Sequence, residues 1–298
     1  MDIPFLVRAA FAVLSCLVIV RRGLKKKSLD LTGAVASVVV GFILTLSNLC
    51  FFASCVTFFL TSSKLTRFKS DIKEKVEDDF KKGGQRNWIQ VLCNGGVPTL
   101  LALFYMIDVG IGEHAIDYAK DFTASVLSIA VLGSFACSCG DTWASEIGTA
   151  ISSHVPVLIT TFGKVPVGTN GGVTITGTVS SILGGTVIGI AYYSTLVAVL
   201  TIRRITVIPP QWPVIVIGCL GGFLGSAFDS LLGATLQYSG FCSVKKRVVH
   251  KPSPTVKHIS GRSILDNHGV NLVSCLLTSI VMPMIGYFLW KGITETNN

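Results

Sequence analysis

Long apolar runs, separated by short polar segments, dominate the chain. They cover residues 3–20, 29–60, 89–107, 122–139, 172–200, 214–236 and 269–290. A helix of about 20 apolar residues crosses the roughly 30 Å hydrocarbon core of a bilayer. The run at 29–60 is too long for one crossing, and the polar pair Ser47 and Asn48 divides it into two short helices. The pattern predicts an all-α, polytopic integral membrane protein, a bundle of about eight transmembrane helices that forms one domain over residues 1–298.

The positions of lysine and arginine test this division into helices. Basic residues concentrate in cytosolic loops of membrane proteins. In this chain 20 of the 25 Lys and Arg residues lie in segments 21–27, 61–88, 141–170 and 238–268, which alternate with the other loops. We therefore expect the loops at 61–88, 141–170 and 238–268 to face the cytosol and both termini to face away from it. The first run contains Arg8 and ends without a small-residue cleavage site, so we expect an uncleaved first helix.

Composition supports a lipid environment. Half of the residues are hydrophobic, 14% are charged, and the mean hydropathy is +0.65, whereas about 25% of residues are charged in an ordinary soluble domain. The net charge of +9 follows from topology, since no loop combines a basic platform with interleaved aromatics, and we expect no nucleic-acid partner. The 30 glycines include the pairs Gly185/Gly189 and Gly218/Gly222, whose four-residue spacing predicts close helix packing.

Residues 140–148 form the first candidate site, because polar groups near the membrane are costly and therefore often functional. They read Gly-Asp-Thr-Trp-Ala-Ser-Glu-Ile-Gly. On a helix, Asp141 and Ser145 would share one face, while Thr142 and Glu146 would share a neighbouring face. Such a segment could hold a divalent cation. The simpler interpretation is a helix end whose carboxylates meet water.

Residues 167–174, Val-Gly-Thr-Asn-Gly-Gly-Val-Thr, form the second candidate, a glycine-rich turn that leads into an apolar helix. Backbone N–H groups at such a turn, together with the helix dipole, suit a phosphate group. The residues concerned are Gly168, Thr169, Asn170, Gly171 and Gly172, and Lys164 upstream could add a contact. The turn lacks the P-loop sequence. An ordinary helix-capping loop explains it equally well.

Asp229 is the third candidate, since it lies inside an apolar run with Ser226 and Ser230 nearby. A carboxylate there must be paired, protonated or metal-bound. The fourth is the entry to the last helix, where Asn267 and Asn271 would share one face. Interhelical hydrogen bonding is the alternative for these amides and for Asn94. The five histidines and nine cysteines are scattered and predict neither a zinc site nor a catalytic triad.

Five motifs resemble those of the transmembrane protein 19 family, and the resemblance covers nearly the whole chain. They are Gly-Leu-Lys-Lys-Lys-Ser-Leu (23–29), Gly-Gly-Gln-Arg-Asn-Trp (83–88), Gly-Asp-Thr-Trp-Ala-Ser-Glu (140–146), Val-Gly-Thr-Asn-Gly-Gly-Val-Thr (167–174) and Asp-Ser-Leu-Leu-Gly-Ala-Thr (229–235). The wider family includes a plant protein linked to glucose-responsive leaf growth and a chloroplast phytyl-phosphate kinase. The second relative implies a reaction.

The resemblance implies an isoprenoid kinase that uses a nucleotide triphosphate, CTP or ATP, and Mg²⁺ to phosphorylate a lipid alcohol or monophosphate. It implies that Asp141, Glu146 and Asp229 bind one or two Mg²⁺ ions, and that residues 168–174 bind phosphates with help from Asn170 and Asn267. Phosphoryl transfer needs mainly positioning and charge neutralisation, which such a site would supply.

Two other functions compete with the kinase. In a transporter or channel, Asp229, Asn94 and Asn271 would line a polar path, and the glycine-rich turn would mark a helix break at a binding site. A protein without catalytic activity is the third interpretation, and it leaves Asp229 unexplained. A transporter predicts that the polar residues gather near the midplane, whereas a kinase predicts that they gather at one membrane face.

Overall fold

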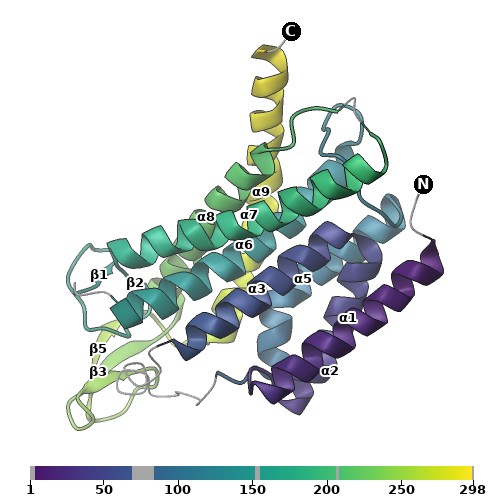
Figure 1. Cartoon of the computed structure of the whole chain (residues 1–298). Helices are drawn as coiled ribbons and strands as arrows, with labels where there is room; N and C mark the ends of the chain where they lie inside the picture. Colours follow the sequence, from purple (N-terminus) through teal and green to yellow (C-terminus); the bar gives the residue numbers. More distant parts are fainter. Residues whose placement is uncertain (1–3, 69–83, 152–154, 206–207, 297–298) are drawn as a thin grey trace.

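The computed structural model describes residues 4–68, 84–151, 155–205 and 208–296. Eight helices in this part of the chain run side by side in one bundle (Figure 1). They are α1 (Phe5–Lys25), α2 (Leu31–Ser47), α3 (Leu49–Arg67), α5 (Trp88–Asp108), α6 (Phe122–Ile151), α7 (Ile175–Ile202), α8 (Pro213–Leu236) and α9 (Asn267–Thr296). The all-α, polytopic fold predicted from the sequence is confirmed.

The outer surface of the bundle is apolar, as a lipid solvent requires. Six of the described helices, α3 and α5–α9, are long and apolar enough to cross a membrane, and α2 is a shorter apolar helix. Large apolar side chains such as Leu6, Val18, Ile107 and Ile202 are more than two-thirds exposed. A soluble protein rarely exposes so extensive an apolar surface.

The helices alternate in direction, so their connections gather at two ends. Helices α1, α3, α6 and α8 end where α2, α5, α7 and α9 begin, and we call this the basic end because segments 21–27 and 238–268 lie there. The opposite end carries segments 109–121, 203–205 and 208–212 and both described termini (Figure 1). This arrangement agrees with the alternation of charge in the sequence, and we predict that the basic end faces the cytosol.

Short strands, which the sequence analysis did not predict, lie within the loops of the basic end. Strands β1 (Val157–Leu158) and β2 (Gly172–Val173) pair antiparallel. Strand β3 (Ser239–Cys242) pairs antiparallel with both β4 (Arg247–Val249) and β5 (Val256–Ser260). The backbone groups of these loops thereby satisfy one another's hydrogen bonds close to the helix ends.

Local side-chain caps explain several helix boundaries. Asn48 ends α2 and begins α3, where its Oδ1 accepts a hydrogen bond from the Cys50 backbone N–H at 2.8 Å. This confirms the predicted turn at Ser47–Asn48. Asp30 caps α2 through Gly33 N–H at 2.8 Å, and Asn87 caps α5 in a reciprocal capping box with Gln90.

The predicted boundary after residue 139 is wrong, because α6 continues through Asp141 and Glu146 to Ile151. Segment 141–151 is not loop, although it is more polar than the rest of the helix. Its residues are held against α7, where Gly148 and Gly177 allow contact between the backbones. The run at 172–200 likewise begins as a helix only at Ile175, after the Thr174 cap. Part of the predicted loop at 61–88, residues 69–83, lies outside the described residues.

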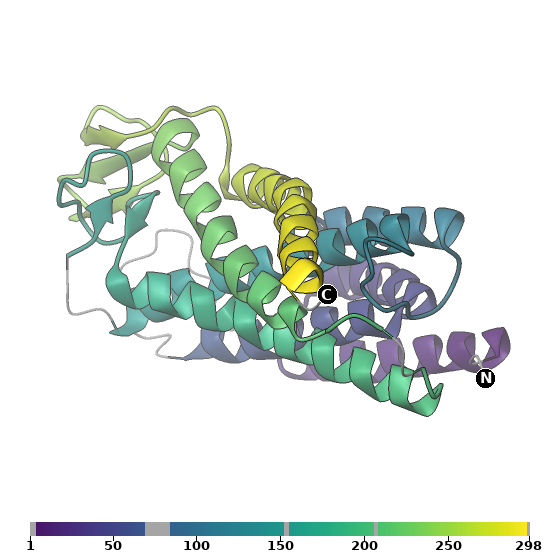
Figure 2. The ribbon, with the colours of Figure 1, turned by 90° about the horizontal axis from the view of Figure 1, so that it is seen from above.

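Glycines bring α6, α7 and α8 into backbone contact. A Cβ atom added to Gly185 of α7, or to Gly140 of α6, would lie 2.7 Å from the Cα of Gly222 in α8, closer than real Cβ contacts. The predicted packing role of these glycines is confirmed. The residues of α6 from Ile129 to Gly140 are all buried. Figure 2 shows the strands of the basic end at the end of the bundle away from the N-terminus. The three helices form the densest part of the bundle.

A buried ionic triad holds the opposite end. The Glu113 carboxylate accepts hydrogen bonds from Arg8 Nη2 at 2.9 Å and from Arg203 Nη2 at 3.0 Å. Its other oxygen accepts from the Leu49 backbone N–H at 2.8 Å. Glu113 thereby joins α1, α3 and the end of α7, and its side chain is fully buried. Buried charges in proteins are paired in this way because an isolated one is too costly.

Candidate functional site

Asp141 of α6 and Asp229 of α8 converge inside the bundle. The glycine contacts place α6 and α8 side by side, since a Cβ on Gly225 would lie 2.6 Å from the Cα of Cys137. Ser226, one residue further along α8, donates its hydroxyl to Asp141 Oδ1 at 3.5 Å. The two carboxylates are close enough for their charges to interact. Two acids placed together in a helical bundle are costly without a counter-charge.

Helix α9 adds hydrogen-bond donors to the same place. Ser274 donates its hydroxyl to Asp229 Oδ2 at 3.2 Å. In the amide orientation that matches donors with acceptors, Asn271 also donates to Asp229 Oδ2 at 3.2 Å and to the Asn267 carbonyl at 2.9 Å. We call Asp141, Ser226, Asp229, Asn271 and Ser274 the carboxylate site. Three helices build it.

The carboxylate site lies in the half of the bundle nearest the basic end. Asp229 precedes the end of α8 by seven residues, and Asp141 precedes the end of α6 by ten. At 1.5 Å per residue these positions are roughly 10 and 15 Å from the helix ends. Both side chains are partly buried. The site is therefore within the bundle and still close to the loops of the basic end.

Glu146 does not join the two aspartates. Among the described residues no three His, Cys, Asp or Glu side chains form a group that could hold a metal ion. The charge of Glu146 instead interacts with that of Arg86. A cation at the carboxylate site would take Asp141 and Asp229 as ligands and complete its shell with hydroxyl, amide or water oxygens. This all-oxygen donor set suits Mg²⁺, which commonly binds one or two carboxylates and keeps several waters.

The glycine-rich turn packs against α8 beside the carboxylate site. A Cβ on Gly171 would lie 2.5 Å from the Ser230 carbonyl oxygen and 2.7 Å from the Ala234 backbone nitrogen. Gly171 has φ +75° and Gly168 has φ +89°, backbone conformations that favour glycine. The turn ends at Thr174, whose hydroxyl accepts the Gly177 N–H at 3.0 Å and caps α7. Residue 230, which touches the turn, directly follows Asp229.

The other predicted residues occupy different positions around this turn. Asn170 connects it to the strands, because its Nδ2 contacts the Tyr238 carbonyl and His250 Nδ1, each at 3.1 Å. Thr169 is buried and donates to the Pro166 carbonyl at 2.7 Å, and the Gly172 N–H donates back to Thr169. Lys164 is exposed on the loop before the turn. Asn267 is exposed at the start of α9, where its carbonyl accepts the hydrogen bond from Asn271.

Two residues that the sequence did not single out, Ser274 and Arg86, make polar contacts inside the structure. Ser274 lies one helical turn beyond Asn271, and this three-residue spacing was a usable signal. Arg86 lies in segment 61–88, which we expected to be a basic cytosolic loop. In the structure it is partly buried, donates to Ser63 Oγ at 2.7 Å and lies 6.0 Å from the centre of the Phe59 ring. Burial lowers the pKa of its guanidinium, against the opposing effect of Glu146.

Comparison with known proteins identifies the family of the chain. Residues 14–279 match the model of a family described as integral membrane protein DUF92. The chain belongs to this family. Protein PGR of Arabidopsis thaliana is 42% identical to the DUF92 chain over 289 residues, which cover 95% of this chain and 98% of the plant protein. The resemblance found in the sequence motifs is thereby confirmed.

More distant relatives of the DUF92 chain are also membrane proteins. An uncharacterized membrane protein of Methanocaldococcus jannaschii is 26% identical over 281 residues, 94% of this chain and 95% of its own. An uncharacterized membrane protein of Synechocystis is 28% identical over 182 residues, 61% of each chain. No solved structure matches the chain. Together with its apolar surface, these matches make it a multi-pass integral membrane protein.

Proposed function

We propose that the protein is an Mg²⁺-dependent kinase that transfers a phosphoryl group from a nucleotide triphosphate, CTP or ATP, to an isoprenoid lipid monophosphate. The observation that carries the proposal is the convergence of Asp141 and Asp229 beside the glycine-rich turn, near one end of a membrane-embedded bundle. The isoprenoid class of substrate rests on the motif resemblance to a family that includes a phytyl-phosphate kinase.

The carboxylate site supplies what phosphoryl transfer requires. When bound, Mg²⁺ would neutralise negative charge on the phosphates that exchange the phosphoryl group. Asp141 and Asp229 would hold it, and Ser274 and Asn271 fix the orientation of the Asp229 carboxylate by donating to Oδ2. The acceptor monophosphate is already ionised, so its attack needs no general base. This agrees with the absence of a histidine from the carboxylate site as described.

The glycine-rich turn would bind the nucleotide phosphates. Gly168 is exposed and has no side chain, so the backbone there can approach a phosphate closely, whereas Gly171 packs against α8. Gly171 packs on α8 next to Asp229, so phosphates bound by the turn would lie near the carboxylate site. The contacts of Asn170 to Tyr238 and His250 give it a positioning role for the turn. Lys164 is exposed on the preceding loop and would add a positive charge.

Transport is the competing function, because Asp141 and Asp229 both lie inside helices and not in loops. A transport site is expected near the bilayer midplane, at broken helices. Here α6 and α8 are continuous through the aspartates, and the aspartates share the basic-end half of the bundle with the glycine-rich turn. These two features favour the kinase.

The test is phosphorylation by the purified full-length protein in detergent, with Mg²⁺, each nucleotide triphosphate and isoprenyl monophosphates of several lengths. We expect Mg²⁺-dependent diphosphate product. Asp141→Asn and Asp229→Asn should each lower the rate by about 10²-fold or more, the loss typical for a preorganised electrostatic contact. Asp108→Asn, an exposed acid at the opposite end of α5, is the matched control and should retain full activity.

Two results would contradict the kinase. One is the lack of phosphorylation by folded wild-type protein with every nucleotide. The other is full activity in both aspartate variants, which would remove the carboxylate site from the reaction. Flux of an ion or solute into proteoliposomes that Asp229→Asn abolishes would support the transporter instead.

A further inference from the structure

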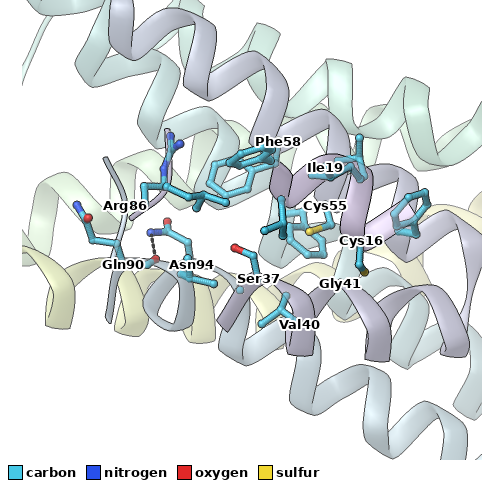
Figure 3. A pocket seen from close by; sticks show the side chains of 18 residues that line it. Cys16, Ile19, Ser37, Val40, Gly41, Cys55, Phe58, Arg86, Gln90 and Asn94 are labelled. Carbon is cyan, nitrogen blue, oxygen red and sulfur yellow. Dashed lines mark hydrogen bonds between the residues drawn. The ribbon is translucent and has the colours of Figure 1, made fainter. Parts of the chain in front are cut away.

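An apolar groove opens between α1, α2, α3 and α5, and Figure 3 shows the side chains that line it. Its cavity volume is about 80 Å³, so it is a narrow groove with room for part of one apolar chain. The apolar lining includes Ile19, Val40, Cys55, Val56 and Phe58. Helix α1 contributes residues down to Cys16, nine positions before its end at Lys25, so the groove extends roughly 13 Å into the bundle from the basic end.

The groove is polar at one end only. Figure 3 shows Arg86, Gln90 and Asn94 together at one end, while Cys16 and Ile19 lie at the other. Arg86 is held by its backbone, which pairs with Ser28 and Asp30 at the start of α2. Its guanidinium donates one hydrogen bond to Ser63 and has four further N–H donors.

A second, basic cavity adjoins the polar end. Phe59 lines both cavities, and Ser63, the hydrogen-bond partner of Arg86, lines the second. Four cationic side chains surround this second cavity, and they belong to Arg22, Lys26, Lys64 and Arg67. Glu146 contributes a negative charge near Arg86. Among the residues that the structure describes around these two cavities, cations therefore outnumber acids, and the charge suits a multiply charged anion.

The geometry points to the groove as the binding site for a lipid with one apolar tail and a phosphate headgroup, with Arg86 as the residue that binds the phosphate. The tail would lie among the apolar residues of α1, α2, α3 and α5. Arg86 would offer its remaining donors to the phosphate in the bidentate geometry that guanidinium groups adopt with phosphates. The adjoining cations would attract the headgroup to this end of the groove.

The groove also approaches the carboxylate site. The backbone carbonyl of Asn94, a residue that lines the groove, accepts a hydrogen bond from the Ser138 hydroxyl at 3.3 Å. Ser138 precedes Asp141 by three residues on α6. A phosphate held by Arg86 would lie beside the segment of α6 that carries both Asp141 and Glu146. The identification of this lipid as the acceptor rests on the proposed function, whereas its binding does not.

The test is binding of radiolabelled geranylgeranyl monophosphate to the full-length protein in detergent, with three unlabelled competitors: geranylgeraniol, inorganic phosphate and dioleoyl phosphatidic acid. Arg86→Gln should weaken binding of the monophosphate at least tenfold and leave competition by the alcohol unchanged. Lys25 is an exposed lysine near the same end, and Lys25→Gln is the charge control. It should change neither the binding of the monophosphate nor the competition by the alcohol.

A second pair of variants tests the tail site without removing a charge. Ser37 lines the groove, so the larger side chain of Ser37→Phe should fill it. The affinity for the monophosphate and the affinity for the alcohol should both fall at least tenfold. Val39 lies on the same helix with a side chain that is 55% exposed, and Val39→Phe should change neither affinity. Thermal unfolding of each variant verifies that it is folded.

Lipid binding in the groove and the kinase reaction can fail independently of each other. Unchanged affinity in folded Arg86→Gln and Ser37→Phe would overturn it, even if Asp141→Asn abolished phosphorylation. Equal competition by inorganic phosphate would show that the tail is not recognised, and equal competition by phosphatidic acid would overturn the single-tail assignment. Tight, Arg86-dependent binding without phosphorylation would support the groove and contradict the kinase.

Discussion

Removing the negative charge of Glu113 should destabilise the protein severely. Glu113→Gln keeps the shape of the side chain and one acceptor oxygen, but it removes the negative charge that pairs with Arg8 and Arg203 inside the bundle. The side chains of these arginines are only 2% and 12% exposed. Arg8 Nη1 already lacks a hydrogen-bond partner among the described residues.

The magnitude follows from the burial of the triad. Breaking a buried ion pair by removing one partner costs about 3–5 kcal/mol. At about 2–4 °C per kcal/mol for a large domain, the unfolding midpoint should fall by roughly 6–20 °C. Tryptophan fluorescence during thermal unfolding in detergent would measure this shift, with wild-type protein at the same detergent and protein concentrations.

The matched control is Glu295→Gln near the end of α9. Glu295 lies 3.9 Å from Lys291, and both side chains are more than half exposed. A solvent-exposed pair contributes about 0–1 kcal/mol, so the midpoint should move by no more than about 4 °C. If Glu113→Gln unfolds at the temperature of this control, water must reach the triad, and the reasoning from burial would be refuted.

Three further stability measurements in the same assay check other parts of the structure. Gly222→Ala should lower the free energy of unfolding by about 1–3 kcal/mol through overpacking against α7. Gly292→Ala should be neutral, because an added Cβ there meets nothing within 4 Å. Equal effects of the two substitutions would contradict the close contact between α7 and α8. Asn48→Ala should cost about 1 kcal/mol by removing the cap of α3, and no loss would mean that tertiary packing alone sets the turn. Asp229→Asn should raise the unfolding midpoint, because it removes one of two carboxyl groups that are placed together inside the bundle; under the proposed function it should also lower phosphorylation, and a lowered midpoint would indicate a structural role for Asp229.

The sequence predicts features that depend on neighbours along the chain. The turn at Asn48 and the glycine spacing of α7 and α8 are of this kind, because a cap and a four-residue repeat are local patterns. The cost of a carboxylate in lipid likewise identified Asp141 and Asp229 before their contact was known. Their convergence could only be proposed, since it depends on how α6 and α8 pack.

Features that depend on tertiary contacts were not predictable in the same way. Arg86 lies in a basic segment that suggests exposure, and only the packing of α2 and α3 around it makes it part of a groove. The continuation of α6 beyond residue 139 was missed because its polar residues resemble a loop. Contacts to α7 and Arg86 compensate for that polarity. The strands of the basic end were missed because their segments are short and pair only in the folded loops.

The ionic triad at the opposite end has a consequence for the synthesis of the protein. Arg8 and Glu113 are separated by 105 residues, so the first helix reaches the translocation machinery long before its partner is made. At about 5–20 residues per second, Arg8 waits roughly 5–20 s for Glu113. During this interval its charge must remain near the interface or in the aqueous interior of the insertion machinery. The first helix can therefore settle in its final position only after α5 has been inserted.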